Sequence, residues 1–209
     1  MTNKAKRLTC VAAAAIAGLM LLADMRPASA DAPEWTVDPA KSSIGFTGRQ
    51  MGVPSKGRFK SFTAKVRFDP SDLAASSVEV TVDAASADAG NADIDKELKQ
   101  PKWFDVARFP TVRFVATAFR AKGPAAGGKG EYEAAARLTI RDVTEEVMLP
   151  FKLDIGPDPA DPGQLVARMT GALTISRTKF GVGRDEWRDT KIVGDEVDLH
   201  IDVLARRKK

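Results

Sequence analysis

The chain has 209 residues, with 32 basic and 28 acidic side chains, a formal net charge of +4, one histidine and one cysteine. This length supports one good hydrophobic core and is short for two domains. So few histidines and thiols exclude the usual zinc and copper sites. A nucleic-acid interface requires a clustered basic surface. The only basic run is residues 206–209, which we interpret as a solvated tail, so no nucleic-acid partner is predicted.

Residues 1–30 have the pattern of a secretory signal peptide. Three basic side chains within residues 4–7 precede an apolar stretch over residues 8–23, and the small residues Ala28-Ser29-Ala30 follow. This order is typical of a cleaved leader, and the apolar stretch is short for a membrane span. We therefore expect cleavage after Ala30, periplasmic localisation, a mature domain over residues 31–209 and no integral membrane segment in it.

Cleavage changes what the composition implies. Residues 1–30 carry four basic and one acidic side chain, so the mature chain keeps 28 basic and 27 acidic ones, a net charge of +1. Cys10 also leaves with the leader. The mature chain then has no disulfide, thiolate metal site or cysteine nucleophile, and its core alone must hold the fold.

Alternation of apolar and polar residues dominates the rest of the chain. Residues 77–83 place three valines on one face, and residues 196–203 repeat the pattern. Such alternation is typical of antiparallel sheets with one face in water. It predicts eight strands, near residues 34–48, 56–69, 76–86, 110–121, 130–141, 144–155, 164–176 and 194–205.

One segment departs from this period. Residues 91–99 read as a short helix, with Asn91 as its N-cap and Ile94 and Leu98 on one face. Pro101 ends it. Eight strands with one helical crossover indicate an all-β closed barrel or a sandwich.

The polar residues indicate little catalytic chemistry. His200 shares a strand face with Asp198 and Asp202, opposite Leu199 and Ile201, so we expect it to face solvent. The carboxylates within residues 88–97 lack the glycine and closing glutamate of a calcium loop. No catalytic residue, metal or cofactor is predicted.

The aromatic residues allow two interpretations: an ordinary filled core, or the lining of a lumen that holds a ligand. An eight-stranded barrel either fills its interior with side chains or leaves room for one small ligand. Several positions assigned to the inner face carry small residues, which favours an incompletely filled lumen: Gly45, Ala64, Ala136, Ala167 and Gly171.

Seven short strings follow one another in a fixed order along the chain, at residues 35–46, 57–59, 68–70, 104–111, 138–144, 176–183 and 193–197. Together this ordered set resembles the YceI-like family of exported, lipocalin-like polyisoprenoid-binding proteins. The resemblance implies an eight-stranded antiparallel lipocalin-like barrel whose lumen holds a long isoprenoid chain or the tail of a quinone. It implies no catalytic residues, and it leaves a homodimer open.

The chain also departs from the family pattern. Lys41 and Gln50 stand where histidines are usual, which weakens proton transfer or metal binding at the barrel mouth. Lys41 is either a surface lysine or a contact for a polar head group. Glycine is usual near Ala136 and at Asp142. Asp142 is compatible with a turn that requires a positive φ.

The leading hypothesis is a periplasmic, non-enzymatic carrier that encloses an isoprenoid lipid, with the segment from Ile94 to Phe104 as a lid. The alternatives are a quinone carrier for an envelope redox system, an enzyme acting on isoprenoids, and a stress-related envelope protein acting through a protein partner. Six phenylalanines are predicted to line the lumen: Phe46, Phe59, Phe68, Phe104, Phe114 and Phe180.

Overall fold

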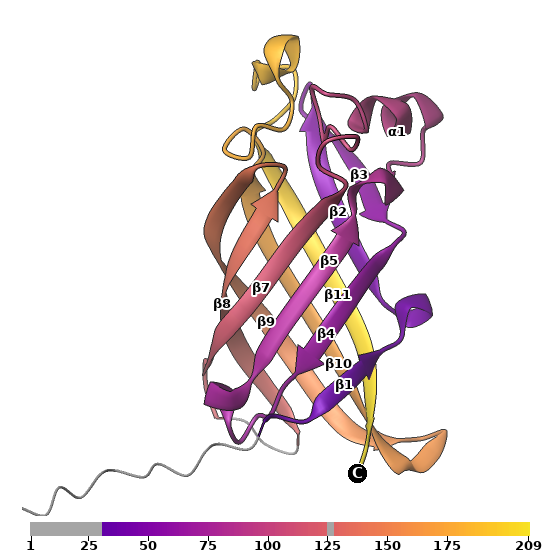
Figure 1. The fold of residues 1–209 in the computed structure, drawn as a ribbon, viewed down its shortest axis with the longest axis vertical. Coiled ribbons are helices and arrows are strands. Elements are labelled where there is room, and N and C mark those ends of the chain that lie inside the picture. The colour runs from indigo at the N-terminus through magenta and orange to yellow at the C-terminus, as the bar shows by residue number, and fades with distance from the viewer. Residues whose placement is uncertain (1–30, 125–127) are drawn as a thin grey trace, which may run out of the picture.

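The computed structural model of the protein describes residues 31–124 and 128–209. The predicted leader over residues 1–30 lies outside the described residues. Eight strands form a closed antiparallel ring in which β1 pairs with both β4 and β11 (Figure 1). This confirms the predicted lipocalin-like barrel. The ring consists of β1 (Glu34–Val37), β4 (Phe62–Arg67), β5 (Ser77–Asp83), β7 (Thr111–Ala121), β8 (Lys129–Ile140), β9 (Val143–Asp158), β10 (Asp161–Ser176) and β11 (Glu196–Lys208).

Three further strands extend the sheet beyond the ring: β2 (Ser43–Gln50), β3 (Val53–Phe59) and β6 (Ala87–Asp88). The long strand β11 pairs with β1 near its carboxyl end and with β2 near its amino end. Strand β3 then pairs with β2, and β6 pairs with β3.

The first two predicted strands are each broken in the structure. Pro39 begins a 3-10 turn, Pro39–Lys41, whose Ala40 N–H donates to the Asp38 carboxylate, so the first strand divides into β1 and β2. Proline suits the first position of a helical turn because it has no N–H to donate. The second strand divides at residues 60–61, where the Lys60 N–H donates to the Ser86 carbonyl.

The two faces of the wall follow the predicted alternation along β11. Leu199 and Ile201 face the lumen, whereas His200 is exposed, as predicted, and its ring lies 3.4 Å from the Thr47 hydroxyl. Gly45 was assigned to the wrong face. A side chain there would point toward the Cβ of His200 on the outside, because Ile44 and Phe46 take the inward positions of β2.

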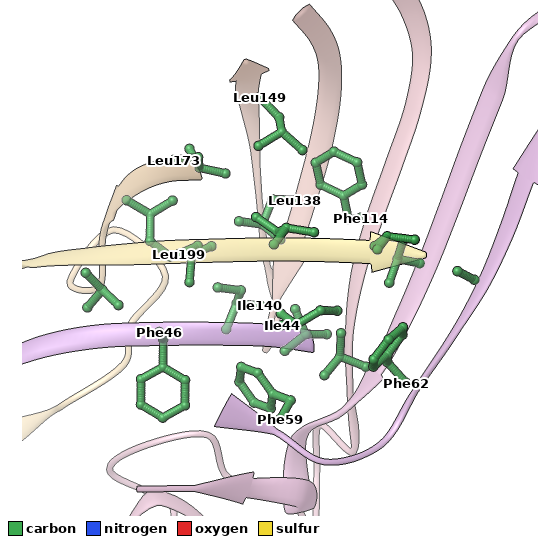
Figure 2. Close-up of a pocket in the computed structure, with 18 of the residues that line it drawn as sticks. Ile44, Phe46, Phe59, Phe62, Phe114, Leu138, Ile140, Leu149, Leu173 and Leu199 are labelled. Atoms are coloured by element: carbon green, nitrogen blue, oxygen red, sulfur yellow. The ribbon is translucent and has the colours of Figure 1, made fainter. Parts of the chain in front are cut away.

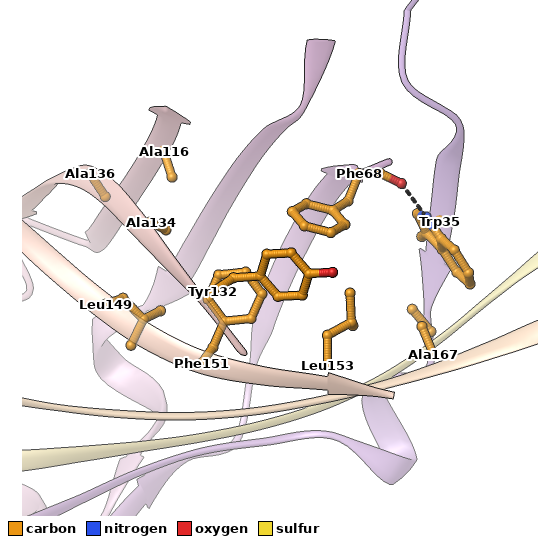
Figure 3. Close-up of a cluster of buried hydrophobic side chains, with 11 residues drawn as sticks. Trp35, Phe68, Ala116, Tyr132, Ala134, Ala136, Leu149, Phe151, Leu153 and Ala167 are labelled. Carbon is orange, nitrogen blue, oxygen red and sulfur yellow. Dashed lines mark hydrogen bonds between the residues drawn. The ribbon is translucent and has the colours of Figure 1, made fainter. Parts of the chain in front are cut away.

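A cluster of large side chains closes the end of the barrel that holds the β9–β10 turn and the chain's carboxyl terminus, which we call the lower end (Figures 1 and 3). The rings of Tyr132 and Phe151 stack at 5.5 Å, and Phe68 packs edge-on against both. The Trp35 indole N–H donates to the Phe68 carbonyl at 3.0 Å. Because Trp35 comes from β1, this plug also seals the closing seam of the ring.

Helix α1 (Ala92–Leu98) lies at the opposite end, which we call the mouth (Figure 1). The Asn91 side chain accepts hydrogen bonds from the N–H groups of Asp93 and Ile94, so the predicted helix and its cap are confirmed. Three short 3-10 turns complete the elements: Leu73–Ala75, Ala84–Ser86 and Asp185–Arg188. Among the described residues, none of the helices combines the length and the apolarity needed to cross a membrane.

The β8–β9 turn differs from the expectation for Asp142. Its positive φ falls on Arg141, at 57°, and not on Asp142. The guanidinium of Arg141 is buried and donates to the carbonyls of Pro101 and Trp103, with the Asp105 carboxylate 3.5 Å away. The uncommon backbone conformation is thus held by a side chain anchored in the segment after α1.

Arg206 joins three parts of the chain at the lower end. Its guanidinium donates to Asp158 at the end of β9, at 2.6 Å, and to Asp38 after β1, at 3.0 Å. The Asp158 carboxylate also accepts the Ala160 N–H, and these two bonds hold its pKa below the ordinary aspartate range. A carboxylate whose pKa is lower in the folded state stabilises the fold above the unfolded-state pKa, about 3.9.

We therefore expect Asp158→Asn to lower the melting temperature at pH 7, and the deficit to shrink as the pH falls below about 3.9. Melting curves of both proteins between pH 7 and pH 2.5 would measure this. A deficit that stays constant over the whole range would show that the charge of Asp158 contributes nothing.

Candidate functional site: the barrel lumen

The barrel encloses an elongated apolar cavity of about 360 Å³. This volume lies within the range of small-molecule sites, about 300 to 1,000 Å³. Figure 2 shows labelled side chains from several strands converging on one interior space. Every ring strand contributes to the lining, for example through Trp35, Ala64, Val78, Phe114, Leu138, Leu149, Leu173 and Leu199 in chain order of the strands.

Five of the six predicted phenylalanines lie on the cavity wall. Phe46, Phe59, Phe104 and Phe114 line it, and Phe68 lines it at the plug. Their contact with a ligand stays a prediction. Phe180 does not line the cavity: it is only 2% exposed and belongs to the buried cluster that includes Val82, Leu138 and Val182. It lies in the turn after β10, where strand alternation no longer determines the direction of a side chain.

The phenylalanines nearest the mouth form a chain of ring contacts. The ring centroids of Phe46 and Phe59 lie 5.4 Å apart, and those of Phe59 and Phe104 lie 5.8 Å apart. Phe104 belongs to the segment that follows α1. Gly57 pairs directly with Phe46 across β2 and β3, and a Cβ at Gly57 would overlap the Phe46 ring. The glycine therefore lets this ring lie flat against the wall.

The small inner residues contribute unequally to the free volume. Ala64 and Ala167 line the cavity as predicted, and so does Ala134, which the sequence reasoning missed. Ala136 lies in the lower core cluster. Gly171 opens no space, because a Cβ there would meet the Pro150 carbonyl oxygen at 3.1 Å; its role is close packing of β10 on β9.

The polar side chains of the lining gather at the mouth. They are Arg49, Gln50, Ser55, Glu97 and Arg177. The lower end presents the aromatic plug instead. The cavity therefore offers apolar contact along most of its length and polar contact at one end.

Arg177 is the most deeply buried cation of the mouth, at 3% exposure. Each of its N–H groups is donated to backbone carbonyls, namely those of Val182, Gly183, Trp187, Val193 and Gly194. Burial lowers the pKa of Arg177, and the nearby Asp195 opposes that effect. With all its donors engaged, Arg177 shapes the loop over residues 178–195 and is not a free cation for a ligand.

Two segments meet over the mouth. Trp103, after α1, lies 5.7 Å from Trp187, and Lys102 pairs with Glu186 at 2.6 Å. The Lys102 carbonyl accepts the N–H groups of Gly183 and Arg184. Ile94, Leu98 and Phe104 line the cavity from above. The segment expected to be a lid therefore covers the mouth; its opening stays a prediction.

The indole N–H groups of Trp103 and Trp187 are buried and find no acceptor among the described residues. Buried donors are normally paired, and an indole nitrogen can only donate. The covered mouth therefore contains two donors that an oxygen acceptor would satisfy once the side chains shift.

The two positions where the family usually has histidine lie apart. Gln50 lines the mouth. Lys41 is exposed in the 3-10 turn between β1 and β2 and does not line the cavity, so it faces no head group there. Within residues 31–124 and 128–209, no three His, Cys, Asp or Glu side chains are grouped to hold a metal ion.

We expect Arg177→Met to destabilise the fold by about 3 kcal/mol or more, because it leaves several buried carbonyls without donors. Urea unfolding would measure the loss. Arg168→Met is the control: Arg168 pairs with Asp202 on the exposed wall, so its loss should cost less than about 1 kcal/mol. Equal losses in the two variants would contradict a special role for Arg177.

The sequence and the fold both have known relatives. The model of the YceI-like domain matches residues 35–205. UPF0312 proteins of Vibrio cholerae are 30% identical over 160 residues, covering 75% of this chain and 81% of the relative. A Pseudomonas aeruginosa UPF0312 protein is 32% identical over 129 residues, covering 62% and 64%.

Solved structures show the same barrel. BcnA of Burkholderia cenocepacia is 36% identical, with a TM-score of 0.69, over 80% of this chain and 98% of that one. A polyisoprenoid binding domain from Saccharophagus degradans has a TM-score of 0.63 over 82% and 97% of the two chains; at 13% identity it shows the fold alone. The match over residues 35–205, together with these relatives, shows that the chain belongs to the YceI-like family.

Proposed function

We propose that this protein is a periplasmic carrier that encloses a long isoprenoid lipid in its barrel lumen and performs no catalysis. The observation that carries the proposal is the cavity itself, which is apolar along its length, closed by aromatic rings at one end and polar at the other. In this proposal residues 1–30 are a leader cleaved after Ala30, and the mature domain is residues 31–209.

The cavity is long as well as apolar. Along β10 its lining runs from Ala167 to Ile175, about 26 Å of strand at roughly 3.3 Å per residue. With the usual strand tilt of about 40°, this corresponds to roughly 20 Å along the barrel axis. A narrow cavity of that length suits an extended chain better than a compact molecule.

Burial of the tail provides the binding free energy. Each buried methylene contributes about 0.8 kcal/mol, so one isoprene unit contributes roughly 3 to 4 kcal/mol. Ordering of the chain and of the mouth offsets part of this gain. Phe46, Phe59, Phe68, Phe104 and Phe114 are the contacts we assign to the tail, with the head group at the mouth.

Membership of the family and the shared fold with the polyisoprenoid binding domain of Saccharophagus degradans support an isoprenoid cargo. A quinone has the same type of tail, and its carbonyl oxygens would also suit the indole donors of Trp103 and Trp187. The apolar lining therefore supports a polyprenol and a quinone carrier equally, and the two differ only in the head group.

We expect protein purified without detergent to carry an extractable isoprenoid lipid, identified by mass spectrometry. Delipidated protein should bind added polyprenol or quinone. The head group found in the extract would separate the two cargoes. The absence of any extracted lipid, together with no binding of either added compound, would refute the proposal.

A lumen-filling variant tests the location of the site. We expect Ala64→Phe to weaken isoprenoid binding at least about tenfold, equivalent to about 1.4 kcal/mol, because the new ring occupies the space of the tail. Thr63→Phe is the matched control, since Thr63 is the exposed neighbour on β4 and does not line the cavity. Circular dichroism would verify that both variants fold. Equal binding by the two variants would place the ligand outside the lumen.

A further inference from the structure

The mouth carries an exposed apolar cluster on its outer rim. Four large hydrophobic side chains are strongly exposed among the described residues, and three of them belong to this rim: Met51 at 78%, Val53 at 66% and Ile192 at 41%. The Met51 N–H donates to the Ile192 carbonyl at 2.7 Å, which ties the β2–β3 tip to the loop before β11. Met148, the fourth, lies on the barrel wall.

The turn that exposes Met51 has an uncommon backbone conformation. Met51 and Gly52 form the turn between β2 and β3, and Met51 has a φ of 48°. A bulky residue is uncommon in this left-handed region, which favours glycine or asparagine. A methionine that is both strained and almost fully exposed contributes nothing to the core, so a binding role accounts for it better than a packing role.

Four cations lie within four residues of the cluster along the chain. Arg49, Lys56, Arg188 and Lys191 are all exposed, and none of them forms an ion pair with another described residue. Other cations near the mouth are neutralised: Lys102 pairs with Glu186 and Lys60 with Asp88.

The same loop also carries acidic groups. Asp185 and Glu186 lie within 3.9 Å of Lys102, which balances part of their charge. The Asp189 carboxylate accepts the Lys191 backbone N–H and keeps its negative charge. Because four cations without an ion pair stand against this one carboxylate, the rim combines exposed apolar side chains with excess positive charge, which is the combination that binds anionic membrane surfaces.

The rim is continuous with the cavity. Arg49, Gln50, Val193 and Gly194 line the cavity and are sequence neighbours of Met51 and Ile192. A stable protein interface buries about 800 Å² on each partner. Three apolar side chains provide much less than that, so the cluster suits shallow insertion into a bilayer better than a stable protein complex.

We infer that the mouth docks on bilayers that contain anionic lipids, with Met51, Val53 and Ile192 in the interfacial layer and the four cations among the head groups. This inference rests on the proposed function, since docking would let an isoprenoid pass between the membrane and the lumen without crossing water. Attraction between exposed charges is screened by salt, so the binding is salt-sensitive.

The test is co-sedimentation of the purified protein with vesicles of phosphatidylcholine alone or mixed with phosphatidylglycerol. We expect binding to the mixed vesicles that weakens at high salt. Met51→Ser combined with Val53→Ser, and Arg188→Glu combined with Lys191→Glu, should each reduce it at least about tenfold. None of these four side chains lines the cavity, and all are exposed, so the variants should fold.

The control variants make the same kinds of substitution at positions away from the rim. Met148→Ser removes the exposed methionine of the wall, and Lys208→Glu combined with Lys209→Glu reverses two charges at the lower end. Both should bind vesicles like the unmodified protein. Failure of the unmodified protein to bind mixed vesicles, or equal losses in the controls, would overturn the inference and leave the rim to a protein partner.

A separate measurement distinguishes this inference from the proposed function. Binding of a short isoprenoid alcohol in solution, without vesicles, reports on the lumen alone, and the four rim substitutions should leave it unchanged. Solution binding without vesicle binding would refute docking and keep the carrier role. Vesicle binding without solution binding would refute the carrier role.

Discussion

The structure depends on closure of the backbone hydrogen-bond ring through β1, a strand of four residues that pairs with both β4 and β11. Closure pairs both edges of the eight-stranded ring with each other and creates an interior of limited width. Once the ring is closed, the alternation of side chains assigns each residue to the lumen or to water. Trp35 and Arg206 reinforce this seam, one by plugging the interior and the other by joining Asp38 and Asp158 outside.

The two ends of the barrel are held by different interactions, and this difference gives the lumen a direction. At the lower end, packed rings of Phe68, Tyr132 and Phe151 fill the interior with few polar atoms. At the mouth, a single guanidinium organises a loop by binding its carbonyls. The same loop is also joined to the segment after α1 by the Lys102–Glu186 pair and by the Lys102 carbonyl. The lower end is therefore closed by ring packing, whereas the mouth is closed largely by polar bonds between two segments, and the mouth is also the end with polar lining.

The sequence predicted most of the wall because its signals are local. The strands at residues 77–83 and 196–203 follow from a period of two residues alone, and the Asn91 cap involves only N–H groups within three residues of it. The predicted first strand is interrupted by the 3-10 turn at Pro39–Lys41, so the alternation does not continue in step across it. A shift of one residue exchanges the inner and outer faces, which is why Gly45 lies on the outside. Phe180 was misassigned because it lies in a turn. The cage around Arg177 was beyond prediction, since its partners are backbone carbonyls, which carry no residue-specific signal. The positive φ in the β8–β9 turn was likewise beyond prediction. It falls on Arg141, whose side chain is held by the carbonyls of Pro101 and Trp103, about forty residues away in the sequence.

The family resemblance and the alternation together predicted the architecture, and five of the six phenylalanines chosen from the sequence lie on the cavity wall. They did not predict the outer rim, because Met51, Val53 and Ile192 come from two separate segments whose contact exists only after folding.

The plug at the lower end has a kinetic consequence. A lumen with one opening admits an elongated occupant only end-on and releases it only by withdrawal along the same path. Each additional unit of length inside then adds contacts that must be broken in sequence before escape, while the step of entry stays the same. For such an occupant, residence time should rise steeply with chain length up to the depth of the plug. Beyond that depth, any further length would remain outside the mouth.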